Sequence, residues 1–462
     1  MADLSLDRIA ALAGGIILAG DPASKFGSFA IDSREVRPGD LFFAIVAGRD
    51  GHDFVADAAA RGARGAVVSR TVAALPPGFA LVRADDTVRA LQALARGVLE
   101  ARAVKVVGVT GSVGKTTTKE FAAAFLASRF EVLKSEGNYN NHLGLALSLL
   151  RLEDRHNAVV LEMAMRAAGE IRTLAAVAPP DVAVITNVQP VHLEFLGNLD
   201  AVAAAKWEIV EGLKPGGTAV INGDDARLEA RAAGWPGRVV RFGFGRNAGV
   251  TACRVRRLGL EGIAFDLSAE GLTEPCQLSF LTDGFLADVL AAAAAALALG
   301  VPLGMIAAEA GRLRPAAHRG PWRKLRDDII LIDDSYNSSP AALETALRDL
   351  AALPARRRVA VLGDMLELGP EEVHFHEEAG RRVAETGWDL LISIGPRALR
   401  LAEGARAAGM AARAVLSFAS SAEAAEALPP LLRAGDLVLV KGSRGVRAEI
   451  VVERLVDEFK ES

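Results

Sequence analysis

A short glycine-containing segment between a strand and a helix constrains this chain most. The run VKVVGVT (104–110) is continuous and rich in β-branched residues, which is typical of a parallel strand buried on both faces. It leads into GSVGKTT (111–117), and a helical pattern follows over 114–128. In such a turn, backbone N–H groups and the helix N-terminus form a concave, positive site for phosphate. The segment therefore predicts an α/β domain that binds a nucleoside triphosphate.

Each residue type in this loop has a chemical reason to be there. Gly111 and Gly114 let the backbone approach a phosphate without a Cβ, Lys115 can reach the β- and γ-phosphates, and the Thr116 hydroxyl can hold Mg²⁺. The pattern G-x-x-x-x-G-K-[ST] fails at one place, where Val109 stands. The alternative interpretation is an ordinary strand–turn–helix with a chance lysine. The predicted ATP-binding residues of the loop are Thr110, Gly111, Ser112, Val113, Gly114, Lys115, Thr116 and Thr117.

Strand and helix patterns alternate along most of the chain, which predicts an α/β fold with doubly wound, mostly parallel sheets. Further strand patterns of the central region lie at 158–164, 181–188 and 218–225, followed by a β-rich stretch over 238–281 and an alanine-rich helix. Four more strand patterns, at 330–335, 358–364, 389–395 and 436–443, predict a C-terminal Rossmann-like α/β domain. We predict three domains, 1–103, 104–315 and 316–462.

Composition excludes several classes of protein. Lys and Arg number 53 against 57 Asp and Glu, a net charge of −4, which argues against a dedicated nucleic-acid binder. The uncharged run 289–308 is mostly alanine and is interrupted by Gly300 and Pro302, so it predicts a buried helix rather than a membrane span. The N-terminus carries Asp3 and Asp7 where a signal peptide needs a basic region. We therefore expect a cytoplasmic protein without a membrane span.

Polar residues after the central strands mark a candidate site. Glu162 ends an apolar strand pattern, where a charge is costly unless it is paired or binds a metal, and we interpret it as a Mg²⁺ ligand. His192 follows the 181–188 strand, at the same sheet edge as the loop if the sheet is parallel. Such a histidine is either structural or a contact to metal or phosphate. The run GNYNNHLG (137–144) contains Asn138, Asn140 and Asn141, of which a turn and helix cap explain one.

The basic stretch 312–326 has two interpretations. It is rich in Arg, Pro, Gly and His and lies between the two α/β regions. It is either a solvated hinge or a segment from which Arg319 reaches a phosphate in the cleft between domains.

Together these segments resemble the Mur ligase family of peptidoglycan synthesis. The resemblance runs nearly end to end, and the order and spacing of its motifs are specific. The motifs are DSREVRPGDLFFAI with GRDGHDF, VTGSVGKTTTKE, GNYNNHLG, LEMAMRAAGEI, ITNVQPVHLEFLG with AKWEI, DDSYNSSP, VLGDMLELG and VKGSRGVR. The resemblance implies that 1–103 binds a UDP-sugar-peptide, 104–315 is an ATPase domain, and 316–462 binds D-alanyl-D-alanine.

The resemblance also implies roles for individual residues. Lys115, Glu162, His192 and Lys206 form the catalytic group, and Thr116, Glu162, His192 and Lys206 form the metal group. Lys206 matches a lysine that is often carbamylated, although an ordinary surface helix lysine would look the same in sequence. Arg319, Asp334 and Asn337 match nucleotide contacts from the last domain. The substrate-binding residues implied are Ser33, Arg34, Asn138, Asn141, Lys441, Ser443 and Arg444.

Two departures from the family pattern affect these expectations. The family usually carries His-Asn-x-x-Asn before the alanine-rich helix, where it helps hold adenine, and here Phe285 and Asp288 replace the asparagines. DDSYNSSP has Ser338 and Ser339 where the family more often has Ala-Asn. Adenine recognition is therefore expected to use other groups.

The function implied is an ATP- and Mg²⁺-dependent, ADP-forming ligase that acts as a monomer. It would join D-alanyl-D-alanine to a UDP-N-acetylmuramoyl-tripeptide through an acyl phosphate, giving the pentapeptide precursor of peptidoglycan. One alternative is another carboxylate–amine ligase of the same fold, acting on a UDP-sugar or a folate. The other is a nucleotide-gated binding module without bond-forming chemistry.

Overall fold

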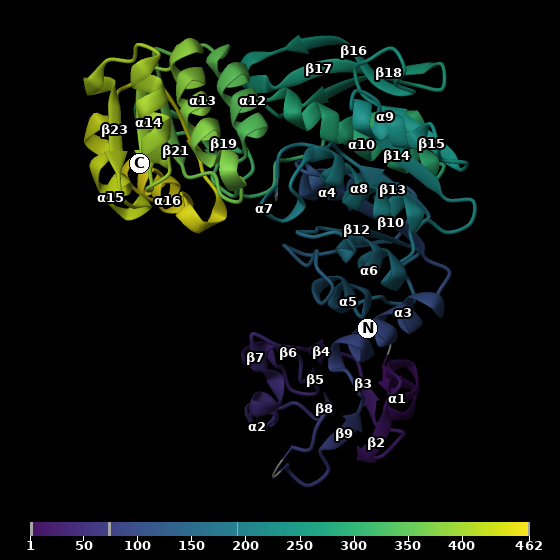
Figure 1. The fold of residues 1–462 in the computed structure, drawn as a ribbon. Helices are drawn as coiled ribbons and strands as arrows, with labels where there is room; N and C mark the ends of the chain where they lie inside the picture. The colour runs from purple at the N-terminus through teal and green to yellow at the C-terminus, as the bar shows by residue number, and fades with distance from the viewer. Residues whose placement is uncertain (1–2, 73–74, 192, 461–462) are drawn as a thin grey trace.

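The computed structural model describes residues 3–72, 75–191 and 193–460. Figure 1 shows three units in chain order, with the N-terminal unit at the bottom, the central unit in teal, and the C-terminal unit at the upper left. Each of the three large sheets falls within one predicted domain range. The boundaries at 103/104 and 315/316 stay predictions. None of the helices in the described part of the chain is long and apolar enough to cross a membrane.

The N-terminal unit is built on a five-stranded sheet with strand order β2-β9-β8-β5-β4. The apolar run LFFAIVAG (41–48) is not one continuous strand, because β5 ends at Phe43 and Gly51 packs against the Ile45 backbone. Its elements are β1 (Leu4–Ser5), α1 (Leu6–Ala13), β2 (Ile16–Ala19), β3 (Lys25–Phe26), β4 (Phe29–Ala30), β5 (Leu41–Phe43), β6 (Val46–Ala47), β7 (Arg49–Asp50), α2 (Val55–Ala60), β8 (Gly65–Val68), β9 (Ala80–Arg83) and α3 (Thr87–Glu100).

The central unit contains a nine-stranded sheet with the order β11-β12-β10-β13-β14-β15-β16-β17-β18. The strands from β11 to β16 are parallel, and β16, β17 and β18 form an antiparallel meander. The strands are β10 (Lys105–Thr110), β11 (Val132–Lys134), β12 (Ala158–Glu162), β13 (Val182–Ile185), β14 (Thr218–Asn222), β15 (Arg238–Phe242), β16 (Val250–Arg257), β17 (Ile263–Ala269) and β18 (Leu272–Leu278).

Helices cover both faces of this sheet, as its apolar strands require. The alanine-rich run forms the buried helix α10, which ends before Gly300 as predicted and packs against α4. The helices are α4 (Lys115–Ala127), α5 (Gly144–Leu149), α6 (Glu170–Val177), α7 (Leu193–Leu196), α8 (Leu199–Glu211), α9 (Ala226–Ala232), α10 (Asp283–Ala298) and α11 (Leu303–Ala310).

The C-terminal unit has a six-stranded sheet, ordered β19-β20-β24-β21-β22-β23, which is parallel except for β19. The sequence patterns missed the short strands β19 and β23, and β19 lies in the stretch expected to be a linker. The elements are β19 (Trp322–Lys324), β20 (Ile330–Asp334), α12 (Pro340–Ala351), β21 (Arg357–Gly363), α13 (Glu372–Glu385), β22 (Leu390–Ile394), α14 (Ala398–Ala407), β23 (Val415–Phe418), α15 (Ser421–Ala427), β24 (Asp436–Lys441) and α16 (Glu449–Glu458).

The topology places the predicted phosphate-binding segment 111–117, which we call the phosphate loop, at the sheet edge where ligands of such folds bind. Strand β10 lies between β12 and β13. The chain passes from β10 to β11 on one side, returns to β12, and then crosses to β13 on the other side. Ligands of open α/β sheets bind beyond the carboxyl ends of the strands at such a reversal. The loop leaves β10 at this edge, and Glu162 ends β12 in register with Val109 of β10.

Candidate functional site

A cavity of about 1000 Å³ lies between the central and C-terminal units. From the central unit it is lined by the phosphate loop, Glu162 and the asparagine run. From the C-terminal unit it is lined by the segments that follow β20, β21 and β24. The predicted residues that line it are Ser112, Val113, Gly114, Lys115, Thr116, Thr117, Asn138, Asn141, Glu162, Arg319, Asp334, Asn337, Lys441, Ser443 and Arg444. One cavity therefore collects most of the residues that the sequence singled out.

Two glycines of the phosphate loop are required by close contacts. Gly111 has φ +153° and Gly114 has φ +84°. A Cβ at Gly111 would lie 1.8 Å from the Thr186 hydroxyl, and one at Gly114 would lie 2.0 Å from a carboxyl oxygen of Asp288. Thr110 and Gly111 lie behind the part of the loop that lines the cavity, so their contact with nucleotide stays a prediction.

Asn187 fixes the shape of the loop, a role that sequence reasoning missed. The backbone N–H of Ser112 donates to the Asn187 carbonyl at 3.1 Å, and that of Val113 donates to Asn187 Oδ1 at 3.0 Å. These two amides are therefore not directed at a phosphate. The amides of the first turn of α4 have no partner inside the helix, so they are the groups that we expect to donate to a phosphate.

Lys115 folds back over the loop. Its Nζ donates to the carbonyls of Gly111 at 2.8 Å and Ser112 at 3.1 Å. Burial lowers the pKa of Lys115, an effect that Glu162 opposes and Arg319 reinforces. The ammonium group is thus held by carbonyls from which a phosphate can draw it away.

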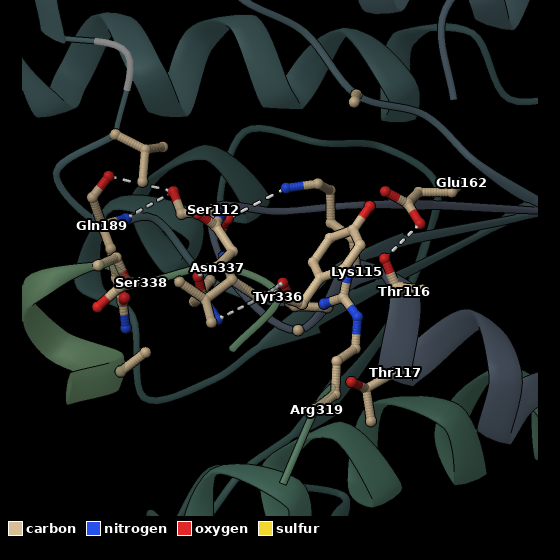
Figure 2. Close-up of a pocket in the computed structure, with 18 of the residues that line it drawn as sticks. Ser112, Lys115, Thr116, Thr117, Glu162, Gln189, Arg319, Tyr336, Asn337 and Ser338 are labelled. Carbon is tan, nitrogen blue, oxygen red and sulfur yellow. Dashed lines mark hydrogen bonds between the residues drawn. The ribbon is translucent and has the colours of Figure 1, made fainter. Parts of the chain in front are cut away.

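Glu162 and Thr116 form an oxygen-rich pair at the end of the loop, as Figure 2 shows. The Thr116 hydroxyl donates to Glu162 Oε2 at 2.7 Å, and Asn140 Nδ2 donates to Oε1 at 2.8 Å. Mg²⁺ in nucleotide sites takes one or two carboxylates together with phosphate oxygens, so this donor set fits the ion. No group of three or more His, Cys, Asp or Glu that could hold a metal ion occurs in the described ranges, so Glu162 is the one carboxylate in this donor set.

The other two residues predicted to bind metal are His192 and Lys206. His192 lies outside the described residues. Lys206 lies on α8 and is 2% exposed, so it is not the ordinary surface lysine that the sequence also allowed. Burial, reinforced by Lys115, lowers the pKa of Lys206 well below its ordinary value. A neutral amine is the form that reacts with carbon dioxide, and carbamylation of Lys206 stays a proposal.

Cations from the C-terminal unit face the loop across the cavity. Figure 2 shows Arg319 against Tyr336, with Lys115 beside them. The Arg319 guanidinium lies 4.0 Å from the centre of the Tyr336 ring, and Arg444 donates to the Tyr336 hydroxyl at 2.8 Å. Lys441 is held by Asp334 at 2.5 Å and by the Asn337 carbonyl at 3.0 Å. These six residues of the C-terminal unit therefore form two linked groups of three, one around Tyr336 and one around Lys441.

The remaining predicted substrate residues are spread over two units. Ser33 is buried and Arg34 is exposed in the N-terminal unit, and neither lines the cavity. Asn138 is exposed at the cavity wall. The Asn141 side chain accepts from the N–H groups of Leu143 and Gly144, and so caps α5. Their contacts with substrate stay predictions.

Two further cavity residues, Arg166 and Glu367, were given no role from the sequence, although each lies in a motif of the family resemblance. Arg166 follows β12, and Glu367 follows β21 with a left-handed φ of +62°. Their charged groups approach to 3.9 Å across the cleft. The two residues are 201 positions apart, so no local sequence pattern could predict that their charged groups lie close together.

Asp288, one of the departures from the family pattern, predicts a pH effect on stability. Burial raises its pKa well above the ordinary value of 3.8, although Thr118 donates to it at 3.2 Å. The folded protein then holds a proton that the unfolded chain releases, so stability falls as pH rises from 3.8 through the raised pKa. Above the raised pKa, the free-energy cost of ionising the buried Asp288 carboxyl lowers stability in full.

We therefore expect Asp288→Asn to raise the melting temperature at pH 8, by roughly 2–4 °C for each kcal/mol recovered. The amide has the shape of the protonated acid, and its oxygen can still accept from Thr118. The gain should shrink as the pH is lowered toward 4. Thermal melts at several pH values test this, and a gain that is constant with pH would contradict it.

The comparisons with known proteins point to one family. Residues 109–296 match the Mur ligase middle domain, and residues 318–444 match the Mur ligase, glutamate ligase domain. The chain is 33% identical to the UDP-N-acetylmuramoyl-tripeptide–D-alanyl-D-alanine ligase of Bacillus subtilis, over 93% of each chain. It is also 33% identical to the Escherichia coli enzyme of that name, over 92% of each.

Solved structures agree with these matches. MurF from Acinetobacter baumannii superposes with a TM-score of 0.90 at 29% identity over 99% of both chains. MurF ligase from Thermotoga maritima in complex with ADP gives 0.83 at 31% identity, over 93% of this chain and 97% of that one. A folylpolyglutamate synthase from Mycobacterium tuberculosis, at 14% identity and a TM-score of 0.63, shares the fold alone.

Proposed function

The chain belongs to the Mur ligase family, and on that premise we propose that it joins D-alanyl-D-alanine to a UDP-N-acetylmuramoyl-tripeptide at the expense of ATP. The relatives that match over more than nine-tenths of their length carry this name. The observation that best supports it here is the shared cavity. The phosphate loop forms one wall, and Arg319, Asp334 and Asn337 of the C-terminal unit face it.

The chemistry requires that the acid be activated. A carboxylate is a poor electrophile, and its oxygen is a bad leaving group. We propose that the terminal carboxylate of the tripeptide attacks the γ-phosphorus of ATP, so that ADP leaves and an acyl phosphate forms. Lys115 and the first-turn amides of α4 would hold the phosphates, and Arg319 would approach from the opposite wall. Phosphoryl transfer depends mainly on such positioning and charge.

Mg²⁺ would be held by Thr116 and Glu162, with His192 and carbamylated Lys206 as proposed ligands of a second ion. When bound, the ion neutralises charge on the phosphoryl oxygens. The chain's own part is to orient these ligands. Asn140 holds one oxygen of Glu162, and Ser135 Oγ accepts from the Glu162 N–H at 3.2 Å.

The second step joins the two substrates. The free amine of D-alanyl-D-alanine would attack the carbonyl of the acyl phosphate and form the C–N bond. Phosphate would leave with the C–O bond electrons, and the nitrogen would lose a proton to the departing phosphate. Lys441, Ser443 and Arg444 line the C-terminal wall, where the amine would enter. Holding both substrates in one cleft supplies proximity. Closure of the two units about 312–326 would keep water from the acyl phosphate.

The rival functions separate in one assay. The protein is mixed with ATP, Mg²⁺ and the UDP-linked tripeptide, and candidate amines are added singly while phosphate release and product mass are followed. We expect a UDP-pentapeptide only with D-alanyl-D-alanine. Product with a different amine or acid would indicate another ligase of the family. Nucleotide binding without any joined product would indicate a binding module.

A further inference from the structure

The segment that enters the C-terminal unit is held by a histidine in a conformation that histidine seldom adopts. His318 has φ +62°, in the left-handed region, where a residue other than glycine persists only if its surroundings hold it. Both its side chain and its backbone carbonyl form hydrogen bonds. Its Nδ1 lies 2.9 Å from Asp333 Oδ2, and its carbonyl accepts from the Tyr336 N–H at 3.0 Å.

The partner of this histidine is a buried carboxylate. Asp333 is 3% exposed. Its second carboxylate oxygen, Oδ1, accepts a hydrogen bond from the Ser335 hydroxyl at 2.6 Å. The backbone adds two bonds, because the Gly320 N–H donates to the Asp333 carbonyl and the Asp333 N–H donates to the Pro321 carbonyl. The stretch 318–321 is thus fastened to the end of β20 on both sides of Arg319.

These hydrogen bonds fix the backbone position of Arg319, which lies inside the stretch 318–321. Its guanidinium lies over the Tyr336 ring, and its charge acts on the loop lysine Lys115 and on Asp288. An arginine side chain has many rotamers, so the position of its backbone decides whether it reaches the loop. Without the hydrogen bond between His318 and Asp333, the backbone of Arg319 would move with the segment 312–326.

We propose that His318 is a positioning residue: through its hydrogen bond to Asp333 it sets the backbone of 318–321 so that Arg319 faces the phosphates of the nucleotide. The inference rests on the proposed function, because it needs a nucleotide at the loop. His318 itself touches no substrate. It acts only through Arg319.

The test uses two substitutions with opposite expectations. His318→Gly suits the left-handed backbone but lacks the side chain, so it should raise the KM for ATP by about tenfold, as expected for a lost hydrogen bond to a charged group. The KM for the UDP-tripeptide should stay within about twofold. His318→Asn tolerates the same φ and places an amide nitrogen where Nδ1 lies, so it should keep nearly the wild-type KM.

A double-mutant cycle separates positioning from a general structural role. In an Arg319→Ala background, His318→Gly should cause little further loss of ATP affinity, measured also as the Kd of ADP. His156→Ala, which removes a histidine bonded to the Glu153 N–H away from the cavity, is the control and should leave both KM values unchanged.

Each result has one meaning. If the wild type neither binds ATP nor forms product, the proposed function fails. If the wild type is active, an unchanged KM in His318→Gly, equal losses in His318→Gly and His318→Asn, or additive effects with Arg319→Ala would each overturn the inference.

Discussion

Lys115→Ala should lower kcat by about 1000-fold, because loss of a group that stabilises developing charge in a closed site costs several kcal/mol. In the structure its ammonium group rests on the carbonyls of Gly111 and Ser112, within reach of a phosphate on the same loop. Affinity for the UDP-tripeptide should be retained, since the residues proposed to bind the sugar, Ser33 and Arg34, belong to another unit. Single-turnover phosphate release and binding calorimetry measure the two quantities.

The control for this substitution is Lys105→Met on the strand that leads to the loop. Lys105 is half exposed and pairs with Asp181 at 3.3 Å, away from the cavity. Its kcat should remain within about twofold of wild type, because exposed ion pairs contribute little. Unchanged turnover in Lys115→Ala would remove the phosphate loop from the mechanism.

Glu162→Gln should have the second-largest effect. The amide keeps the shape of the side chain and can still accept from Asn140, but it removes the charge that a divalent ion needs. We expect kcat to fall by about 100-fold and the Mg²⁺ concentration for half-maximal rate to rise, because metal-based charge stabilisation is worth several kcal/mol. Rates across a Mg²⁺ titration give both values, and thermal melts report on folding.

Glu120→Gln on α4 is the matched substitution. Its carboxylate pairs with Lys119 at 3.0 Å and with Lys134 outside the cavity, so its Mg²⁺ dependence should not change. If Glu162→Gln showed the same Mg²⁺ dependence and rate as wild type, the assignment of the ion to this carboxylate would be wrong.

The parts of the site that the sequence predicted are those with a local signal. A buried strand, a glycine turn and a lysine are consecutive, and Glu162 stands out as a charge at the end of an apolar strand. The α/β class and most strands followed from apolar runs. The edge strands β19 and β23 were missed because they are short and only partly buried.

The parts that could not be predicted depend on contacts between distant segments. Asn187 shapes the loop from 74 residues away, and Asp333 on β20 holds His318 from 15 residues away. The burial of Lys206 also had no clear pattern, because α8 is buried around most of its surface. For the C-terminal wall, the residues alone indicated Arg319, and the others came from the family resemblance.

The acyl-phosphate mechanism is tested most directly by tracing an oxygen atom from the tripeptide carboxylate to the released phosphate. The UDP-tripeptide is prepared with ¹⁸O in its terminal carboxylate and converted with ATP, Mg²⁺ and D-alanyl-D-alanine, and the released phosphate is analysed by mass spectrometry. Activation through an acyl phosphate predicts one ¹⁸O in each phosphate, matched by one UDP-pentapeptide. Pentapeptide formed with unlabelled phosphate would contradict the mechanism, and ATP hydrolysis without pentapeptide would contradict the function.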